Sequence, residues 1–289
     1  MSHDQRRRAL LLRLFGDFAL RWFETAHALF DGDYEGVCTL LAVLQANVRA
    51  VGEDAALNGQ YDRTPPPDEL RKPVSLREAA RSLGVPRERF RRRAALLVAA
   101  GAFQLRDEGY IVPSATIDAD TSRKHCRAVG VFYRRLKQAG FALADIATTD
   151  EPNAWRQGVL RVMGDVVVTW ARLASQAADG NLMLAVVFAA LIQANDHPGE
   201  EDAEHPPRPI SAHALALSLA VPRETVRRHV AQLETMGWAR RVTGGFVVSP
   251  AVLEGEAIAF VDPLFDLTRT LFQRLADQGA VFSSDYGLG

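Results

Sequence analysis

The chain is poor in cysteine, in aromatic residues and in long apolar runs, and neither sign of charge dominates. Its two cysteines, Cys38 and Cys126, are too few for a disulfide framework, so we expect reduced thiols in a cytoplasmic protein. The longest uncharged apolar run, about Leu182–Ala190, is far shorter than a membrane-spanning helix requires. A formal net charge of −1 excludes a polycation, so any affinity for nucleic acid depends on local clusters of charge.

Motifs for catalysis are also lacking. The sequence contains no glycine-rich phosphate loop, no nucleophile motif and no paired carboxylates, so it predicts neither an enzyme nor a bound cofactor. His197 and His205 flank the acidic stretch Glu200–Glu204, which at first suggests a metal site. The stretch lacks ligand-like repeat spacing, and we interpret it as a solvated acidic loop without a metal.

The N-terminal segment is basic and then apolar, as in a signal peptide. However, Arg13, Asp17 and Arg21 interrupt the apolar run at helical spacing, and no small-residue cleavage site follows. A matching segment, Leu160–Trp170, lies in the middle of the chain, where a targeting signal cannot act. We therefore expect an amphipathic structural helix at the N-terminus.

An internal duplication is the strongest pattern in the sequence. Aligned without a gap, Pro73–Pro113 and Pro209–Ser249 are identical at roughly 16 of about 41 positions. The best-matched stretch runs from Val85 to Glu88 in the first copy and from Val221 to Glu224 in the second. A repeat of this length indicates that one structural unit occurs twice in the chain.

The duplication extends over the whole chain. Gly16-Asp17 matches Gly164-Asp165, and Gln45-Ala46-Asn47 matches Gln193-Ala194-Asn195. A longer loop in the first copy, Asp54–Lys72, accounts for the change of offset between these matches and the later ones. The sequence therefore predicts two domains and a short polar linker, with the domains at residues 1–147 and 148–289 and the linker at Thr148–Trp155.

Each copy predicts the same series of elements, and the expected fold class is mainly α. A long helix, a second and very apolar helix, a short helix, a helix that begins at proline, a β-hairpin and a closing helix follow one another. In the first copy we expect them at Gln5–Phe30, Tyr34–Val51, Ser75–Val85, Pro86–Gly101, Phe103–Arg106 with Tyr110–Val112, and Ser122–Ala139. In the second copy we expect them at Asn153–Ala178, Asn181–Asn195, Ser211–Val221, Pro222–Gly237, Ala239–Val242 with Phe246–Val248, and Asp262–Gln278.

Two local signals refine this series. Ser75 precedes the short helix with Glu78 three residues on, which predicts a capping box; Ser211 can cap likewise, although Ala214 replaces the glutamate. Gly16 and Gly164 fall inside helices, where glycine costs about 1 kcal/mol relative to alanine. Either a close contact between the two halves or a local kink explains a glycine there.

Arginines cluster on one face of the proline-initiated helix of each copy. A solvated helix surface looks the same, but the position between a short capped helix and a hairpin favours contact with DNA. A helix fits the major groove of B-DNA, and the arginine fork matches a guanine edge or a phosphate. The candidate DNA-contacting residues are Arg77, Arg87, Arg89, Arg91, Arg92 and Arg93 in the first copy and Arg223, Thr225, Arg227, Arg228, His229, Arg240 and Arg241 in the second.

The segment Pro209–Val248 resembles the winged helix-turn-helix of bacterial transcriptional regulators, and the order of helices around it is similar to that of MarR-type regulators. MarR-type regulators pair two chains through their outer helices. The resemblance therefore implies two tandem winged domains that pair within one chain as a pseudo-dimer. The first hairpin, with acidic Asp107 and Glu108, suits a phosphate backbone less well than the second, so either a DNA-binding wing or a plain hairpin fits it.

The resemblance implies a sequence-specific transcriptional regulator that binds double-stranded DNA. Its two recognition helices would enter successive major grooves, with half-sites about 34 Å apart. A replication initiator with tandem winged domains and a winged-helix scaffold that binds protein instead of DNA are the alternatives. A small-molecule effector and a second copy of the chain are further candidate partners, and Trp22 and Trp170 belong either to the core or to a ligand pocket.

Overall fold

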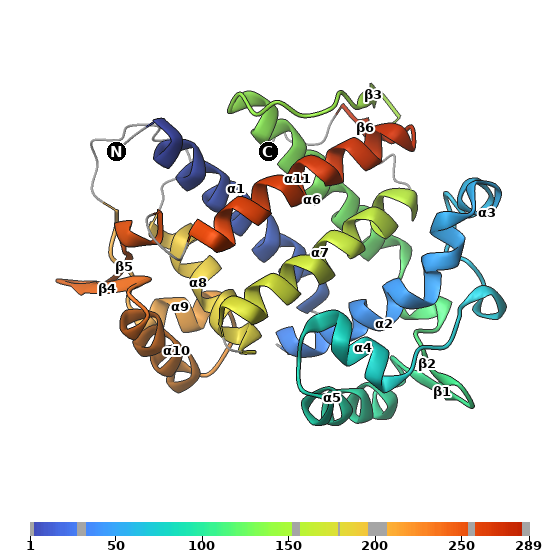
Figure 1. Ribbon diagram of the computed structural model, residues 1–289, viewed down its shortest axis with the longest axis horizontal. Helices are drawn as coiled ribbons and strands as arrows, with labels where there is room; N and C mark the ends of the chain where they lie inside the picture. Colours follow the sequence, from blue (N-terminus) through green and yellow to red (C-terminus); the bar gives the residue numbers. More distant parts are fainter. Residues whose placement is uncertain are drawn as a thin grey trace.

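The computed structural model describes residues 3–27, 33–151, 157–178, 180–195, 207–253 and 258–284 (Figure 1). It is mainly helical, as the sequence predicts. The first repeat contains α1 (His3–His27), α2 (Tyr34–Glu53), α3 (Ala55–Gln60), η1 (Asp68–Leu70), α4 (Leu76–Leu83), α5 (Arg87–Ala99), β1 (Gln104–Arg106), β2 (Gly109–Ile111), η2 (Ser114–Thr116) and α6 (Ala119–Gln138). The second contains β3 (Ala147–Thr149), α7 (Gln157–Ala177), α8 (Leu182–Asn195), α9 (Ala212–Ser218), α10 (Arg223–Thr235), β4 (Ala239–Val242), β5 (Gly245–Val248), η3 (Pro250–Leu253), α11 (Ile258–Asp277) and β6 (Val281–Ser283).

A helix pair followed by a hairpin occurs once in each half. We call residues 74–112, with α4, α5, β1 and β2, unit 1, and residues 210–248, with α9, α10, β4 and β5, unit 2. The serine N-caps that the sequence predicts are confirmed: the hydroxyl of Ser75 accepts a hydrogen bond from the Glu78 backbone N–H at 3.2 Å, and that of Ser211 from Ala214 at 3.1 Å. The reciprocal bond to the Glu78 side chain, which would complete the predicted capping box, is not formed among the described residues. Both hairpins are antiparallel, also as predicted.

Each hairpin is also paired to the segment that precedes its helix pair. Val74 bridges to Tyr110 in unit 1, and Ile210 bridges to Phe246 in unit 2. At this crossing Gly109 has φ +143°, and a Cβ there would overlap the carbonyl of Val74; Gly245 stands in the same relation to Ile210. Glycine is thus required where the hairpin passes the incoming chain, since any side chain would separate them.

The long helices are exchanged between the two halves. α1 packs against α8 of the second half and α6 of its own, while α7 packs against α2 of the first half and α11 of its own. Aromatic contacts join the halves at the centre, where the ring centroids of Phe15 and Trp170 lie 6.1 Å apart and those of Phe132 and Phe272 lie 5.8 Å apart. One hydrophobic core therefore runs through both repeats, so the sequence boundary at 147/148 does not divide the packing.

The helical glycines lie at the contact between the halves, as one of the two sequence interpretations expects. Gly16 of α1 faces the Ala189 carbonyl of α8, 3.7 Å from where its Cβ would be, whereas a Cβ at Gly164 of α7 would overlap the Gln45 amide of α2. Neither α1 nor α7 is interrupted at its glycine. The absent side chain at Gly16 lets α1 approach the backbone of α8, and the one at Gly164 leaves room for the Gln45 side chain of α2.

Two features depart from the predicted series. The expected loop Asp54–Lys72 contains α3 and η1, and Asp54 caps α3 through its carboxylate. The expected linker begins with β3, which pairs in parallel with β6 near the C-terminus. Three-residue strands are too short to produce a recognisable periodicity, so only the tertiary pairing reveals them. The ends expected at Phe30 and Asn153, and the linker residues 152–156, lie outside the described residues.

Other expectations concern the core. Trp22 and Trp170 are buried, and Cys38 and Cys126 are buried thiols. α8 is buried almost all round, in agreement with its continuous apolar sequence. Within the described residues no single helix is long and apolar enough to cross a membrane. α7 and α8 meet that criterion only when taken together, and the chain bends by 100° between them.

Candidate nucleic-acid interface

The second helix of each unit presents arginines on its exposed face. Arg87, Arg91 and Arg92 of α5 are exposed, as is Arg77 of α4, and no ion pair involving Arg77 or Arg87 occurs within the described part of the chain. Arg91 binds Glu88 at 2.7 Å, and these hydrogen bonds lower the pKa of the Glu88 carboxyl to about 2. The surface of α5 therefore keeps a positive excess at neutral pH.

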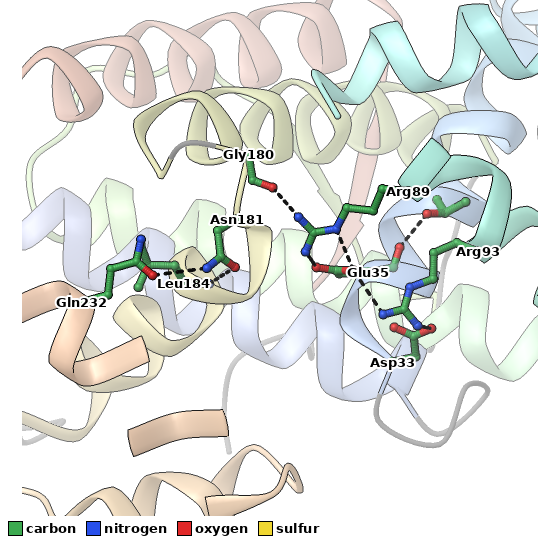
Figure 2. A network of polar contacts seen from close by, with 9 residues as sticks. Asp33, Glu35, Arg89, Arg93, Gly180, Asn181, Leu184 and Gln232 are labelled. Atoms are coloured by element: carbon green, nitrogen blue, oxygen red, sulfur yellow. Dashed lines mark hydrogen bonds and ion pairs between the residues drawn. The ribbon is translucent and has the colours of Figure 1, made fainter. Parts of the chain in front are cut away.

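Arg89 and Arg93 of α5 are engaged by carboxylates, which the sequence interpretation did not foresee. Arg89 binds Glu35 and donates from Nη1 to the Gly180 carbonyl at 2.8 Å (Figure 2). Arg93 binds Asp33 and also Glu35, the latter at 3.1 Å. Their guanidinium groups are held at the start of α2 by carboxylates, and the DNA-contact role expected for them stays a prediction.

The corresponding face of α10 also presents exposed arginines. Arg223, Arg227 and Arg228 are exposed, and Arg227 binds Glu224 at 2.6 Å. His229, which the sequence places among the DNA-contacting residues, is only 3% exposed, and its Nδ1 lies 2.6 Å from the Thr225 carbonyl, to which it donates. Burial is the main cause that lowers the pKa of His229. The ring is therefore neutral and withdrawn from the surface, which corrects the role expected for it.

The two hairpins differ in chemistry. The second exposes Arg240 and Arg241, and Arg241 lies over the Phe246 ring at 4.5 Å while binding Glu234 at 3.4 Å. The first exposes Asp107 and Glu108 at its turn and Leu105, 62% exposed, on its strand. The second hairpin is thus suited to a polyanion and the first is not.

The ion pair between Glu35 and Arg89 belongs to the first half alone. In the alignment of the two halves Glu35 stands opposite Met183, and its partner Arg89 stands opposite Thr225. The acid and the arginine are thus present together in one half and absent together in the other. Many other positions also differ between the halves, so the contact itself is recognised only in the structure.

A solvent-connected cavity of about 70 Å³ lies beside Trp22 between α1, α2, α6 and α7. Most of its wall is apolar, and Arg161 lines it as well, held by the Asn58 side chain at 2.6 Å. The Trp22 indole N–H is buried and has no hydrogen-bond partner within the described residues. The mostly apolar wall suits a small apolar group.

A neutral histidine stacks on this tryptophan. The rings of His125 and Trp22 are 4.3 Å apart, and His125 Nε2 donates to the Trp22 carbonyl at 3.2 Å. Burial lowers the pKa of His125 to about 4, so the ring carries no charge at neutral pH. The stack closes one wall of the cavity.

Within the described residues, no cluster of three or more potential metal ligands occurs. The acidic stretch between His197 and His205 lies outside those residues. Comparisons with protein-family models, with curated proteins and with solved structures found no match.

Proposed function

We propose that this chain is a sequence-specific, double-stranded DNA-binding transcriptional regulator, made of two winged helix-turn-helix units that pair within one chain as a pseudo-dimer. The observation that carries the proposal is the repetition of one arrangement. In each unit a serine-capped helix is followed by a helix with exposed arginines and then by an antiparallel hairpin. A solvated basic surface on a single helix would need no such repeated context.

The exposed arginines support a DNA-facing role. Arg87, Arg91 and Arg92 of unit 1 are the repeat counterparts of Arg223, Arg227 and Arg228 of unit 2, and all six are exposed. Guanidinium groups at the start of such a helix reach base edges or phosphates once the helix enters the major groove. Arg240 and Arg241 would add phosphate contacts from the second hairpin.

The exchange of long helices supports the pairing of the units. α1 and α7 each pack on the second helix of the other half, as expected of an intertwined dimer in which the two chains have become one. α5 and α10 both lie on the lower side of the view in Figure 1. Since the two exposed faces are not identical, we expect an imperfectly palindromic site with half-sites about 34 Å apart.

Selection of bound sequences from a random duplex library, followed by a protection footprint, tests the proposal. We expect one enriched, imperfect palindrome and a footprint of more than one helical turn. The double variant Arg227→Ala/Arg228→Ala should weaken binding and reduce its salt dependence, because each lost phosphate contact removes counterion release. Arg269→Ala, an exposed arginine of α11 bound to Asp266, is the matched control. Absence of any complex at low ionic strength refutes the proposal.

A protein-binding scaffold is the second candidate, because unit 1 exposes large apolar side chains. Leu96 of α5 and Leu105 of β1 are 61% and 62% exposed. A winged unit that binds protein would flow through a DNA column at moderate salt, whereas the regulator would be retained. In the regulator, the cavity beside Trp22 is the candidate site for a small-molecule effector, and a cytoplasmic location is part of the same proposal.

A further inference from the structure

The start of α2 contacts both units. The Tyr34 hydroxyl donates to the Leu219 carbonyl, at the end of α9 in unit 2, at 3.1 Å, and this bond is buried. The next residue, Glu35, accepts hydrogen bonds from Arg89 of unit 1. Arg89 in turn donates to the Gly180 carbonyl, in the turn between α7 and α8, at 2.8 Å (Figure 2). We call the bonds that Tyr34 and Arg89 make to Leu219, Glu35 and Gly180 the inter-half joint.

The inter-half joint is one-sided. Its side chains all come from the first half, and its acceptors in the second half are backbone carbonyls. The repeat counterpart of Tyr34 is Leu182 and that of Arg89 is Thr225, neither of which can reach an equivalent carbonyl by a long polar side chain. In the second half, Asn181 instead hydrogen-bonds Gln232 of its own α10 at 3.4 Å (Figure 2).

These bonds restrain the position of α5, because the groups that make them are partly buried and charged. The Glu35 side chain is 16% exposed, so its carboxylate depends on Arg89 and Arg93 for compensation. A hydrogen bond that involves a charged guanidinium is stronger than one between neutral groups, and the planar fork fixes its direction. Arg89 thereby ties α5 to two points, the start of α2 and the turn before α8.

We propose that Tyr34 and Arg89 are positioning residues that fix the separation of α5 and α10. If the chain binds DNA as proposed above, they also set the half-site spacing that it accepts. The first part concerns the protein alone and does not depend on DNA. The joint connects unit 1 to unit 2 through the start of α2, so loss of its bonds removes this polar link between them.

Spin labels on the two helices measure this separation directly. Ala95 of α5 and Ala231 of α10 are exposed and are repeat counterparts, so the pair Ala95→Cys/Ala231→Cys reports α5 against α10. The native cysteines are buried and should label little. In the labelled full-length chain we expect a narrow distance distribution, which broadens when Tyr34→Phe and Arg89→Gln are combined. Arg123→Gln, an exposed arginine bound to Asp120, is the matched control and should leave the distribution unchanged.

Arg89→Lys guards against loss of folding in the double variant. Lysine keeps the charge beside Glu35 but cannot span both acceptors, so the distribution should have an intermediate width. A folded double variant with the wild-type distribution overturns the proposal. Binding to duplexes with varied spacers then tests the DNA part: the wild type should prefer one spacer and the double variant should lose that preference. Failure of all duplexes to bind while the distribution still broadens refutes the proposed function and leaves the positioning role intact.

Discussion

Asn47 and Asn195 make the same three hydrogen bonds in the two halves of the molecule. Asn47 Nδ2 donates to the carbonyls of Lys72 and Tyr110 at 2.7 and 3.0 Å, and its Oδ1 accepts from the Val112 N–H at 2.9 Å. Asn195 repeats this arrangement, with distances of 2.8, 3.2 and 2.7 Å to Arg208, Phe246 and Val248. Each asparagine thus joins the end of a central helix, α2 or α8, to the strand that closes the hairpin.

Loss of either amide should therefore destabilise the fold. We expect Asn47→Ala to lower the free energy of unfolding by about 1–3 kcal/mol, because two carbonyls and an N–H lose a buried partner. Asn195→Ala should have a similar effect, since its bonds are equivalent. Urea unfolding measures both, with exposed Gln60→Ala as the control. A neutral Asn47→Ala would mean that water replaces the amide.

The two interface glycines should respond oppositely to alanine. In Gly164→Ala the new Cβ overlaps the Gln45 side-chain amide, which must rotate away, so we expect a loss of about 1 kcal/mol. In Gly16→Ala the nearest atom is 3.7 Å away, so the helix propensity of alanine should raise stability by up to about 1 kcal/mol. Thermal and urea unfolding of both variants test this, and an equal gain of stability in both would mean that the Gln45 side chain moves away from Gly164 without cost.

A left-handed residue ends the first helix of each unit, and the two units use different residues for it. Gly84 has φ +66° and its repeat counterpart Ala220 has φ +50°. Because this region costs an alanine roughly 1–2 kcal/mol, Ala220→Gly should stabilise the chain by about 1 kcal/mol and Gly84→Ala should destabilise it by a similar amount. Chemical unfolding gives both values. Destabilisation by Ala220→Gly would argue that the turn is not left-handed in solution.

The buried His125 predicts a loss of stability in mild acid. Its folded pKa is about 4, below the ordinary value of 6.5, so the unfolded chain binds a proton that the folded chain excludes. Its contribution is fully present above pH 6.5 and is lost as the pH falls toward 4, by about 3 kcal/mol in total. Urea unfolding between pH 7 and pH 4 should show a shallower pH dependence for His125→Gln than for the wild type. His213→Gln, at an exposed position of α9, should keep the wild-type slope.

The proposed DNA interface predicts unequal hairpins. Arg240→Ala should weaken binding and reduce the salt slope by about 1, the value for one lost phosphate contact. Arg106→Ala in the first hairpin should change the slope little, because Arg106 lies beside the Asp68 carbonyl at 3.4 Å and next to an acidic turn. Titration of one duplex at several salt concentrations measures the salt slope of each variant. A larger effect of Arg106→Ala would reverse the assignment of the two hairpins.

Local features of the fold were determined by the sequence. The caps at Ser75 and Ser211, the helices that begin after Pro86 and Pro222, and the hairpins follow from neighbouring residues, whose preferences do not depend on distant partners. The duplication added that each element occurs twice. Periodicity and capping therefore placed most helix ends within a few residues of those in the structure.

Only the tertiary structure decided which elements of the two halves pack together. The exchange of α1 and α7, the β3–β6 pair, the burial of His229 and the capture of Arg89 by Glu35 all join residues far apart in the chain. The sequence around Arg89 does not reveal whether its guanidinium is solvated or bound by a carboxylate 54 residues away. Its availability to a ligand depends on electrostatics and burial that exist only after the halves have packed.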